Sequence, residues 1–201
     1  MMTYLSGLKI IKITRGRIMG KLILVTGGSA SGKSKYAENL ITEMERNFSN
    51  PKTTYIATAK MVDDEMKRRI KKHQERRPTH WNTELACYDL ILPLKKLSKT
   101  EDNILLDSLS MYLSNKLLSF DEKKTSELFS QVIKDLSEVS DICENSNSTV
   151  VIVTDEIGWG LIPANSMGRT FRDLLGEANQ ILASKASEVY LVVCGIPQRI
   201  K

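Results

Sequence analysis

Apolar residues gather in five short runs along this chain, each about as long as one strand. They span residues 22–26, 53–57, 103–107, 149–154 and 188–194. The runs are rich in β-branched residues and do not alternate apolar with polar positions, which is typical of strands buried on both faces of a parallel sheet. Longer segments with helical spacing separate them, at residues 33–46, 63–76, 109–118, 126–139 and 167–186. Strands that alternate with helices predict an α/β sandwich, in which helices flank a mostly parallel central sheet.

Length and composition place this sandwich in a single domain. The chain has 201 residues, of which 41% are hydrophobic and 26% charged, as in an ordinary globular protein. We expect one domain over residues 21–201 and an N-terminal extension over residues 1–20, to which we assign no role. The net charge of +5 comes from scattered basic residues, so it favours polyphosphate ligands over a nucleic-acid partner.

Hydropathy and cysteine content predict the cellular location of the protein. No apolar run reaches the ~18 residues that a membrane span needs, so we expect no membrane span. The three cysteines, Cys87, Cys143 and Cys194, are widely separated and fit no metal-binding spacing. Such a set is typical of a reducing compartment, and we therefore expect a cytoplasmic protein.

The first apolar run leads into a glycine-rich loop, and the first helical segment follows that loop directly. The loop consists of Gly27, Gly28, Ser29, Ala30, Ser31, Gly32, Lys33 and Ser34. Strand, loop and helix in this order are the context of the phosphate-binding motif G-x-x-x-x-G-K-[ST], the P-loop. Backbone N–H groups of such a loop hold nucleotide phosphates, the lysine reaches the β and γ oxygens, and the serine binds Mg²⁺. A turn without a ligand has no use for the Lys33–Ser34 pair, so we predict a nucleoside triphosphate site.

Carboxylates follow two other strands of the predicted sheet. Asp107 ends one apolar run, and Asp155 and Glu156 follow another. Ligands of open α/β sheets bind beyond the carboxyl ends of the strands, where a P-loop protein also carries the acid that supports Mg²⁺. Asp107 is our candidate for that metal, although an aspartate at a strand end also commonly caps the next helix. Spacing alone leaves the roles of the three carboxylates open.

A predicted helix that ends before Pro78 carries the second candidate for chemistry. Arg69, His73 and Arg76 or Arg77 fall along one side of it, where an imidazole among guanidinium groups suits the handling of phosphate. Nearby positive charge would also lower the pKa of the histidine and keep it nucleophilic near neutral pH. The pattern alone favours a plainer interpretation, in which His73 extends an apolar stripe into the core.

Two other features leave their interpretation open. The glycine-rich loop at residues 156–163 either closes over a bulky substrate with Trp159 or is a plain connector with a buried tryptophan. This loop and Arg172 are candidates for substrate contact only. His80, the other histidine, is expected to pack or to form a hydrogen bond rather than to react.

Taken in order along the chain, these motifs resemble a known family. The chain is similar to the bifunctional adenosylcobinamide kinase / adenosylcobinamide-phosphate guanylyltransferases of cobalamin biosynthesis. The resemblance covers nearly everything from about residue 21 to the C-terminus. The matching segments are residues 23–28 with 33–34, 55–59, 63–66 with 69–70 and 73, 77–78 with 81, 105–107, 153–160, 171–173, 179–180 and 189–196.

The resemblance implies two activities in one protein. ATP or GTP would phosphorylate the aminopropanol hydroxyl of adenosylcobinamide, with Lys33 at the phosphates and Mg²⁺ held by Ser34 and Asp107. His73 would then attack the α-phosphate of GTP and carry GMP as a phosphoramidate. The GMP passes to adenosylcobinamide phosphate and gives adenosylcobinamide-GDP. The resemblance thus favours a catalytic His73 over a core histidine.

The resemblance also implies further nucleotide contacts and a subunit arrangement. Besides the P-loop, the residues along the guanine nucleotide would be Ala57, Thr58, Ala59, Gln74, Glu75, Arg76, Arg77, Glu84 and Asp107. The family forms trimers with nucleotide sites near the subunit contacts, which implies a homo-oligomer here.

Two positions depart from the family pattern. Family members commonly have glutamate where Asp107 stands, and the shorter side chain would reach a metal through water. They also show a Trp-x-Thr-x-Glu pattern, whereas residues 81–85 place Glu84 one position early. The nucleotide contact of Glu84 is therefore an open question.

Two other functions compete with this hypothesis. The first is a monofunctional P-loop small-molecule kinase in which His73 only contacts phosphate. The second is a regulatory or nucleic-acid-associated ATPase, against which the scattered charge and the lack of an aromatic and basic array count.

Overall fold

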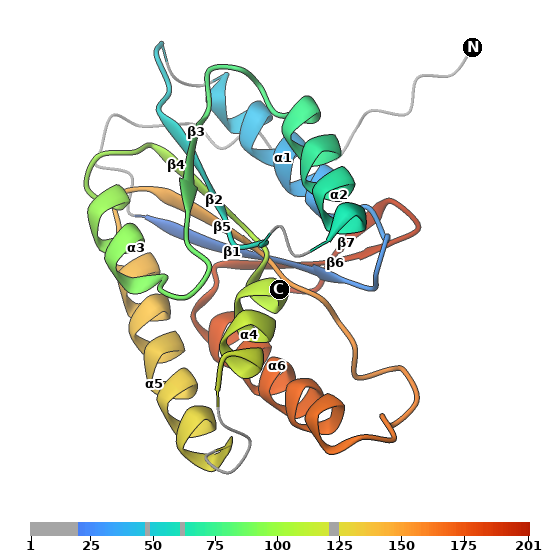
Figure 1. The fold of residues 1–201 in the computed structure, drawn as a ribbon. Coiled ribbons are helices and arrows are strands. Elements are labelled where there is room, and N and C mark those ends of the chain that lie inside the picture. The colour runs from blue at the N-terminus through green and yellow to red at the C-terminus, as the bar shows by residue number, and fades with distance from the viewer. Residues whose placement is uncertain (1–19, 47–48, 61–62, 121–124) are drawn as a thin grey trace.

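A seven-stranded sheet forms the centre of the molecule (Figure 1). The computed structural model describes residues 20–46, 49–60, 63–120 and 125–201. The strand order is β3-β2-β4-β5-β1-β6-β7, and all neighbouring strands are parallel except β6 and β7. The strands are β1 (Lys21–Gly27), β2 (Thr53–Ala57), β3 (Asn82–Leu85), β4 (Asn103–Asp107), β5 (Thr149–Val153), β6 (Glu188–Val193) and β7 (Ile196–Arg199).

Helices cover both faces of this sheet. They are α1 (Lys33–Glu45), α2 (Asp64–Arg76), α3 (Ile91–Leu97), α4 (Leu109–Leu118), α5 (Thr125–Glu144) and α6 (Ser166–Lys185). Helices α1 and α2 lie on one face, and α3, α4, α5 and α6 lie on the other (Figure 1). The α/β sandwich expected from the sequence is therefore confirmed. In the described part of the chain, no helix has the length and apolar character needed to cross a membrane.

Alternate residues of the central strands fill two separate cores. Leu22 and Leu24 of β1 point into the larger core, under α3 to α6, whereas Ile23 and Val25 point into the smaller core, under α1. Because both faces are covered, the middle residues of these strands are mostly apolar on both faces, which explains the apolar runs without alternation in the sequence. All five predicted strands are present, with ends within one residue of the predicted ones.

The sequence did not predict β3, β7 and α3. Strands β3 and β7 lie at the two edges of the sheet, and their residues are mostly or wholly exposed. An edge strand needs no continuous apolar run, and a proline such as Pro197 of β7 is tolerated in a sheet only at such an edge. Helix α3 has only seven residues, too few for a clear helical period. The expected extension over residues 1–20 lies outside the described residues except for Gly20.

The strand register brings the predicted site residues to one edge of the sheet. Ala57 of β2 pairs with Asp107 of β4, Asp107 pairs with Val153 of β5, and Val153 pairs with Val25 of β1. The P-loop, Asp107 and Asp155 therefore all follow the carboxyl ends of adjacent strands. This edge is where ligands of such sheets bind.

Candidate active site

The P-loop is held from behind by the turn between β6 and β7. The Gly195 N–H donates to the Ser31 carbonyl over 2.8 Å. A Cβ atom on Gly27 would lie 2.4 Å from the Val192 carbonyl oxygen, and one on Gly32 would lie 3.1 Å from the Cα of Gly195. Two of the motif glycines are thus required because the backbone of the neighbouring strand comes so close.

The front of the P-loop offers unused donors. Among the described residues, no side chain caps the start of α1, which follows Gly32, so its first N–H groups have no side-chain partner there. The Ser31 hydroxyl is buried and has no hydrogen-bond partner among the described residues. Helix N-termini with free N–H groups bind phosphate, and a buried orphan hydroxyl fits the same ligand.

The two candidate carboxylates contact different residues of the P-loop. The Lys33 ammonium lies 2.5 Å from Oδ1 of Asp155 and donates to the Gly28 carbonyl over 3.0 Å. Ser34 instead donates to Oδ1 of Asp107 over 3.3 Å. The structure thereby separates two residues whose roles the sequence left open.

Asp107 and Ser34 together fit a magnesium site. Both offer oxygen ligands, which Mg²⁺ prefers. The Asp107 side chain is only 8% exposed, and the Tyr55 hydroxyl donates to its Oδ2 over 2.8 Å. This hydrogen bond orients the carboxylate toward Ser34. Burial, with Asp107 adding to it, raises the pKa of Tyr55, so the phenol stays protonated and keeps donating.

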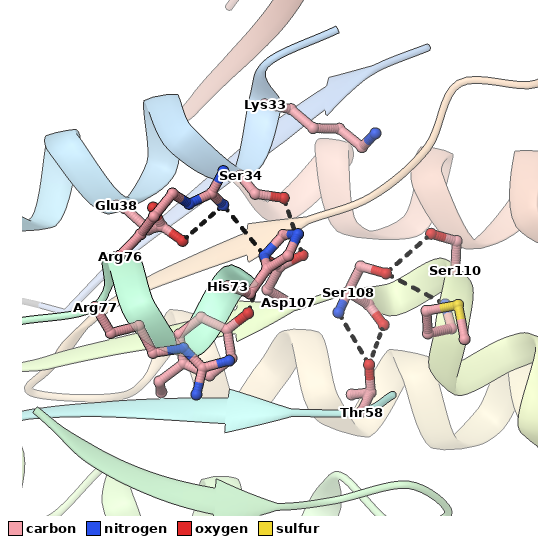
Figure 2. A network of polar contacts seen from close by, with 12 residues as sticks. Lys33, Ser34, Glu38, Thr58, His73, Arg76, Arg77, Asp107, Ser108 and Ser110 are labelled. Atoms are coloured by element: carbon pink, nitrogen blue, oxygen red, sulfur yellow. Dashed lines mark hydrogen bonds and ion pairs between the residues drawn. The ribbon is translucent and has the colours of Figure 1, made fainter. Parts of the chain in front are cut away.

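His73 faces this same carboxylate from α2 (Figure 2). Its Nδ1 atom lies 3.7 Å from Oδ2 of Asp107 and 3.2 Å from a guanidinium nitrogen of Arg76. The imidazole is 34% exposed, so it does not continue an apolar stripe into the core, and that interpretation was wrong. Nothing is described of the Arg69 side chain, which the sequence placed on the same side.

Burial lowers the pKa of His73, and the positive charges of Arg76, Arg77 and Lys72 add to this effect. The carboxylate of Asp107 opposes it but does not reverse it. The imidazole is therefore neutral near pH 7 and has a free electron pair. Since a guanidinium only donates, the contact with Arg76 places that pair on Nδ1 and the proton on Nε2.

Glu38, His73 and Asp107 lie close enough to suggest a metal cluster, because their ligand atoms lie within 4.8 Å of one another. Arg76 argues against that interpretation. It contacts Oε1 of Glu38 over 3.3 Å and Nδ1 of His73 over 3.2 Å, so a positive charge already occupies the group. Burial raises the pKa of Glu38, and the charge of Arg76 opposes this shift. A phosphate among Arg76, Arg77 and His73 fits this charge distribution better.

The other residues expected along the nucleotide have varied surroundings. The Thr58 hydroxyl is buried, accepts from the Ser108 N–H over 2.9 Å and donates to the Ser108 carbonyl over 2.7 Å, so it links β2 to α4. Arg77 lies 3.3 Å from the centre of the Tyr55 ring. Gln74 and Glu75 are exposed on α2, and Glu84 is half-buried on β3, paired with Ile56.

Two site residues were missed in the sequence: Glu38 and Tyr55. Glu38 stands four positions after Ser34, so helical spacing places it on the same face of α1. Tyr55 stands two positions before Ala57, which strand alternation places on one face of β2. Ser110 was expected near the ligand because it follows the strand that ends at Asp107, but its contact depends on where Asp155 lies.

The class of the protein follows from these elements, and its family follows from comparisons with known proteins. A strand, a phosphate-binding loop and a helix, with carboxylates and a histidine around them, define a P-loop nucleotide-binding protein. Residues 23–200 match the family described as cobinamide kinase / cobinamide phosphate guanyltransferase. The chain therefore belongs to this family, which unites both activities in one enzyme of cobalamin biosynthesis.

Individual relatives are similar over nearly their full length. The bifunctional adenosylcobalamin biosynthesis protein CobU of Salmonella typhimurium is 37% identical over 186 residues, which cover 90% of this chain and 99% of that protein. CobU of Escherichia coli is 35% identical with the same coverage. CobP of Pseudomonas aeruginosa is 32% identical over 178 residues, 89% of this chain and 96% of that protein. Among solved structures, a KaiC-like protein of Pyrococcus horikoshii OT3 aligns at a TM-score of 0.45 and 13% identity, covering 86% of this chain and 71% of that one.

Proposed function

We propose that one site around the P-loop phosphorylates adenosylcobinamide and then transfers GMP to the product through His73. The observation that supports this most directly is the shared carboxylate. Asp107 lies 3.3 Å from Ser34 of the P-loop and 3.7 Å from His73 of α2. A histidine that only packed against the sheet would have no reason to face Asp107, the candidate metal ligand beside the P-loop.

In the kinase step, the P-loop positions the nucleotide and Lys33 stabilises its phosphates. Lys33 leaves its contact with Asp155 and binds β and γ oxygens, as the lysine of this motif does. Ser34 and Asp107 would hold Mg²⁺, which when bound neutralises charge on the phosphates. Both ATP and GTP are candidate donors, because the P-loop contacts phosphates and not the base.

In the guanylyl step, His73 acts as the nucleophile. Its nitrogen attacks the α-phosphorus of GTP, the bond from that phosphorus to the bridging oxygen breaks, and pyrophosphate leaves with the electron pair. A neutral imidazole is needed, and the lowered pKa of His73 supplies it. An oxygen of adenosylcobinamide phosphate then attacks the same phosphorus. The P–N bond breaks, and adenosylcobinamide-GDP and free His73 form.

The nitrogen that attacks is set by the partners of the ring. With Arg76 donating to Nδ1, the electron pair of Nδ1 is occupied. In this structure Nδ1 lies 3.7 Å from Oδ2 of Asp107. If Arg76 turns to a phosphate, the imidazole can adopt its other tautomer, in which Nδ1 carries the proton and points it toward Asp107. The electron pair is then on Nε2, which is free to attack. A carboxylate that holds one imidazole nitrogen and so orients the other is a common arrangement in catalysis.

The remaining parts of the proposal rest on the family pattern. Ala57, Thr58, Ala59, Gln74, Glu75, Arg76, Arg77 and Glu84 would line the guanine nucleotide. The buried Thr58 hydroxyl already binds Ser108, so its contribution would come from the backbone. The protein would act in the cytoplasm as a homo-oligomer, a trimer, with no nucleic-acid partner.

A labelling experiment tests the guanylyl step. The protein is incubated with Mg²⁺ and GTP labelled at the α-phosphate, then denatured, and the bound label is tested for acid lability and alkali stability. His73→Ala is expected to remove the label completely. His80→Ala is the matched control, because His80 pairs with Glu45 at 3.2 Å, away from the P-loop, and this variant keeps the label. Kinase turnover without any covalent label would leave a monofunctional kinase.

A further inference from the structure

Asp155 is a carboxylate beside the P-loop that has no role in the kinase and guanylyl steps proposed for Lys33, Asp107 and His73. Its Oδ1 lies 2.5 Å from the Lys33 ammonium, and the Ser110 hydroxyl donates to its Oδ2. Its backbone carbonyl accepts from the Asn179 amide over 3.0 Å. Asn179 in turn accepts from Thr154 over 2.7 Å. Both the side chain and the backbone of Asp155 are thus held in place, while 29% of the side chain stays exposed.

The position of Asp155 relative to the nucleotide follows from Lys33. Lys33 contacts Asp155 in this structure and, in this motif, binds the β and γ oxygens. When Lys33 turns from Asp155 to those oxygens, the fixed Asp155 carboxylate is left beside the phosphoryl group that is transferred. The negative charge of Asp155 there repels the γ-phosphate unless the carboxylate has another partner. The metal is an unsuitable partner, because Ser34 contacts Asp107 and not Asp155. A hydroxyl group that must lose its proton is a suitable one.

A cleft of about 570 Å³ begins at the next residue, Glu156, and runs along α6. Its lining includes Glu156, Gly158, Arg172 and Asn179. Asn179 therefore lines the cleft and also binds the backbone of Asp155. The Nη1 atom of Arg172 is buried and has no hydrogen-bond partner among the described residues. A cleft with an unused buried donor fits a polar, oxygen-bearing ligand.

The loop that leaves the cleft at Gly158 is apolar and exposed. Trp159 is 78% exposed, Leu161 96% and Ile162 74%, so Trp159 is not the buried connector residue that the sequence allowed. Large apolar side chains exposed together on one short loop mark a binding surface. Cobinamide combines the two matching parts, a broad macrocycle and amide-bearing arms, one of which ends in the hydroxyl to be phosphorylated.

We propose that Asp155 is a catalytic residue of the kinase step alone, and that the cleft beside it admits the hydroxyl-bearing arm of cobinamide. This rests on the kinase half of the proposed function. The hydroxyl oxygen attacks the γ-phosphorus, and its proton passes to Asp155. The bond from the γ-phosphorus to the β-γ bridging oxygen breaks, and the nucleoside diphosphate leaves with the electron pair. Arg172 donates to an amide carbonyl of the arm, and Ser110 is a positioning residue that orients the carboxylate.

The variant Asp155→Asn separates this role from the alternatives, because it keeps the shape of the side chain and removes the base. Three quantities are measured: phosphorylation of adenosylcobinamide, covalent labelling by α-labelled GTP, and guanylylation of supplied adenosylcobinamide phosphate. The kinase kcat is expected to fall by at least about 100-fold. The covalent label and the guanylylation of supplied phosphate are expected within about twofold of the unaltered protein. Asp141→Asn, a carboxylate on α5 paired with Lys185, is the matched control and changes nothing.

A second variant keeps the test decisive if Asp155→Asn folds poorly. Ser110→Ala removes the hydrogen bond to Oδ2 and is expected to lower the kinase kcat about tenfold at unchanged KM for the nucleotide. Equal losses in the kinase and labelling reactions, in protein with an unchanged melting temperature, would place Asp155 in the shared nucleotide site and overturn the proposal. So would a retained kinase rate in Asp155→Asn. Failure of the proposed function has a different signature, which is absence of kinase activity in the unaltered protein.

Discussion

The P-loop and α2 bring the two halves of the chemistry together, but they are built in opposite ways. The P-loop follows a strand in the middle of the sheet and is held by backbone contacts to its neighbours, such as the bond from Gly195 to Ser31. Helix α2 has no buried side chain among those described. Polar contacts of His73 and Arg76 with Asp107 and Glu38 connect it to the body of the protein.

This difference shows which interactions position the residues of each activity. The geometry of the P-loop depends on packing and close backbone approach, so it is fixed by the fold. The position of His73 depends on charged contacts of α2 with the largely buried carboxylates of Asp107 and Glu38, so it responds to the phosphates that bind among them. Changes in the P-loop region are therefore expected to affect folding or both activities, whereas changes on α2 affect the guanylyl step.

The largest expected effect is in the P-loop itself. Lys33→Ala removes the charge that stabilises the transferred phosphoryl group, and the kinase rate is expected to fall by about 1,000-fold or more. The rate is measured with adenosylcobinamide and saturating ATP or GTP. Lys35→Ala, on the same helix but outside the motif, is the control and retains the rate. Kinase activity that survives Lys33→Ala would break the assignment of this loop to the phosphates.

The packing side of the comparison is tested by Gly27→Ala. The added Cβ would lie 2.4 Å from the Val192 carbonyl, so the strands must shift. We expect the free energy of unfolding to fall by about 1–3 kcal/mol. Chemical denaturation measures it, with Gly28→Ala as the control, because a Cβ at that position has no heavy atom of the described residues within 4 Å apart from its chain neighbours. Equal stability of the two variants would show that close backbone approach does not hold the loop.

The electrostatic contacts of α2 are tested by Arg76→Gln. This variant is expected to change the pH dependence of the labelling rate. Arg76 is one of the positive charges that lower the pKa of His73, so its removal raises that pKa. Since only the neutral imidazole attacks, the acid limb of the labelling rate is expected to move to higher pH. Lys71→Ala, on an exposed part of α2, is the control and leaves the profile in place. A limb that stays or moves to lower pH would contradict the role of Arg76.

The same contrast explains how much the sequence could predict. The five central strands were predictable because residues such as Leu22 to Val25 are buried on both faces and leave an unbroken apolar run. The P-loop was predictable because its chemistry is local in the chain. Strand β7 was not, because an exposed edge imposes no such pattern and Pro197 opposed it.

The site was harder to predict where its residues meet through the fold. Asp107 is the last residue of β4 and Asp155 lies two residues past the end of β5, and only the three-dimensional arrangement pairs one with Ser34 and the other with Lys33. His73 lies on a polar helix whose pattern alone suggested packing. Its partner Asp107 is far away in sequence, so no spacing rule could connect them.

The central claim is that His73 becomes covalently bound to GMP beside the P-loop. Peptide mapping by mass spectrometry, after incubation with GTP and Mg²⁺ and digestion under alkaline conditions, tests it most directly. We expect the added mass of GMP on the peptide that contains His73, with fragment ions that place it on that residue. GMP found on another residue, such as Lys33 or His80, would contradict the account. So would unmodified His73 in protein that actively forms adenosylcobinamide-GDP.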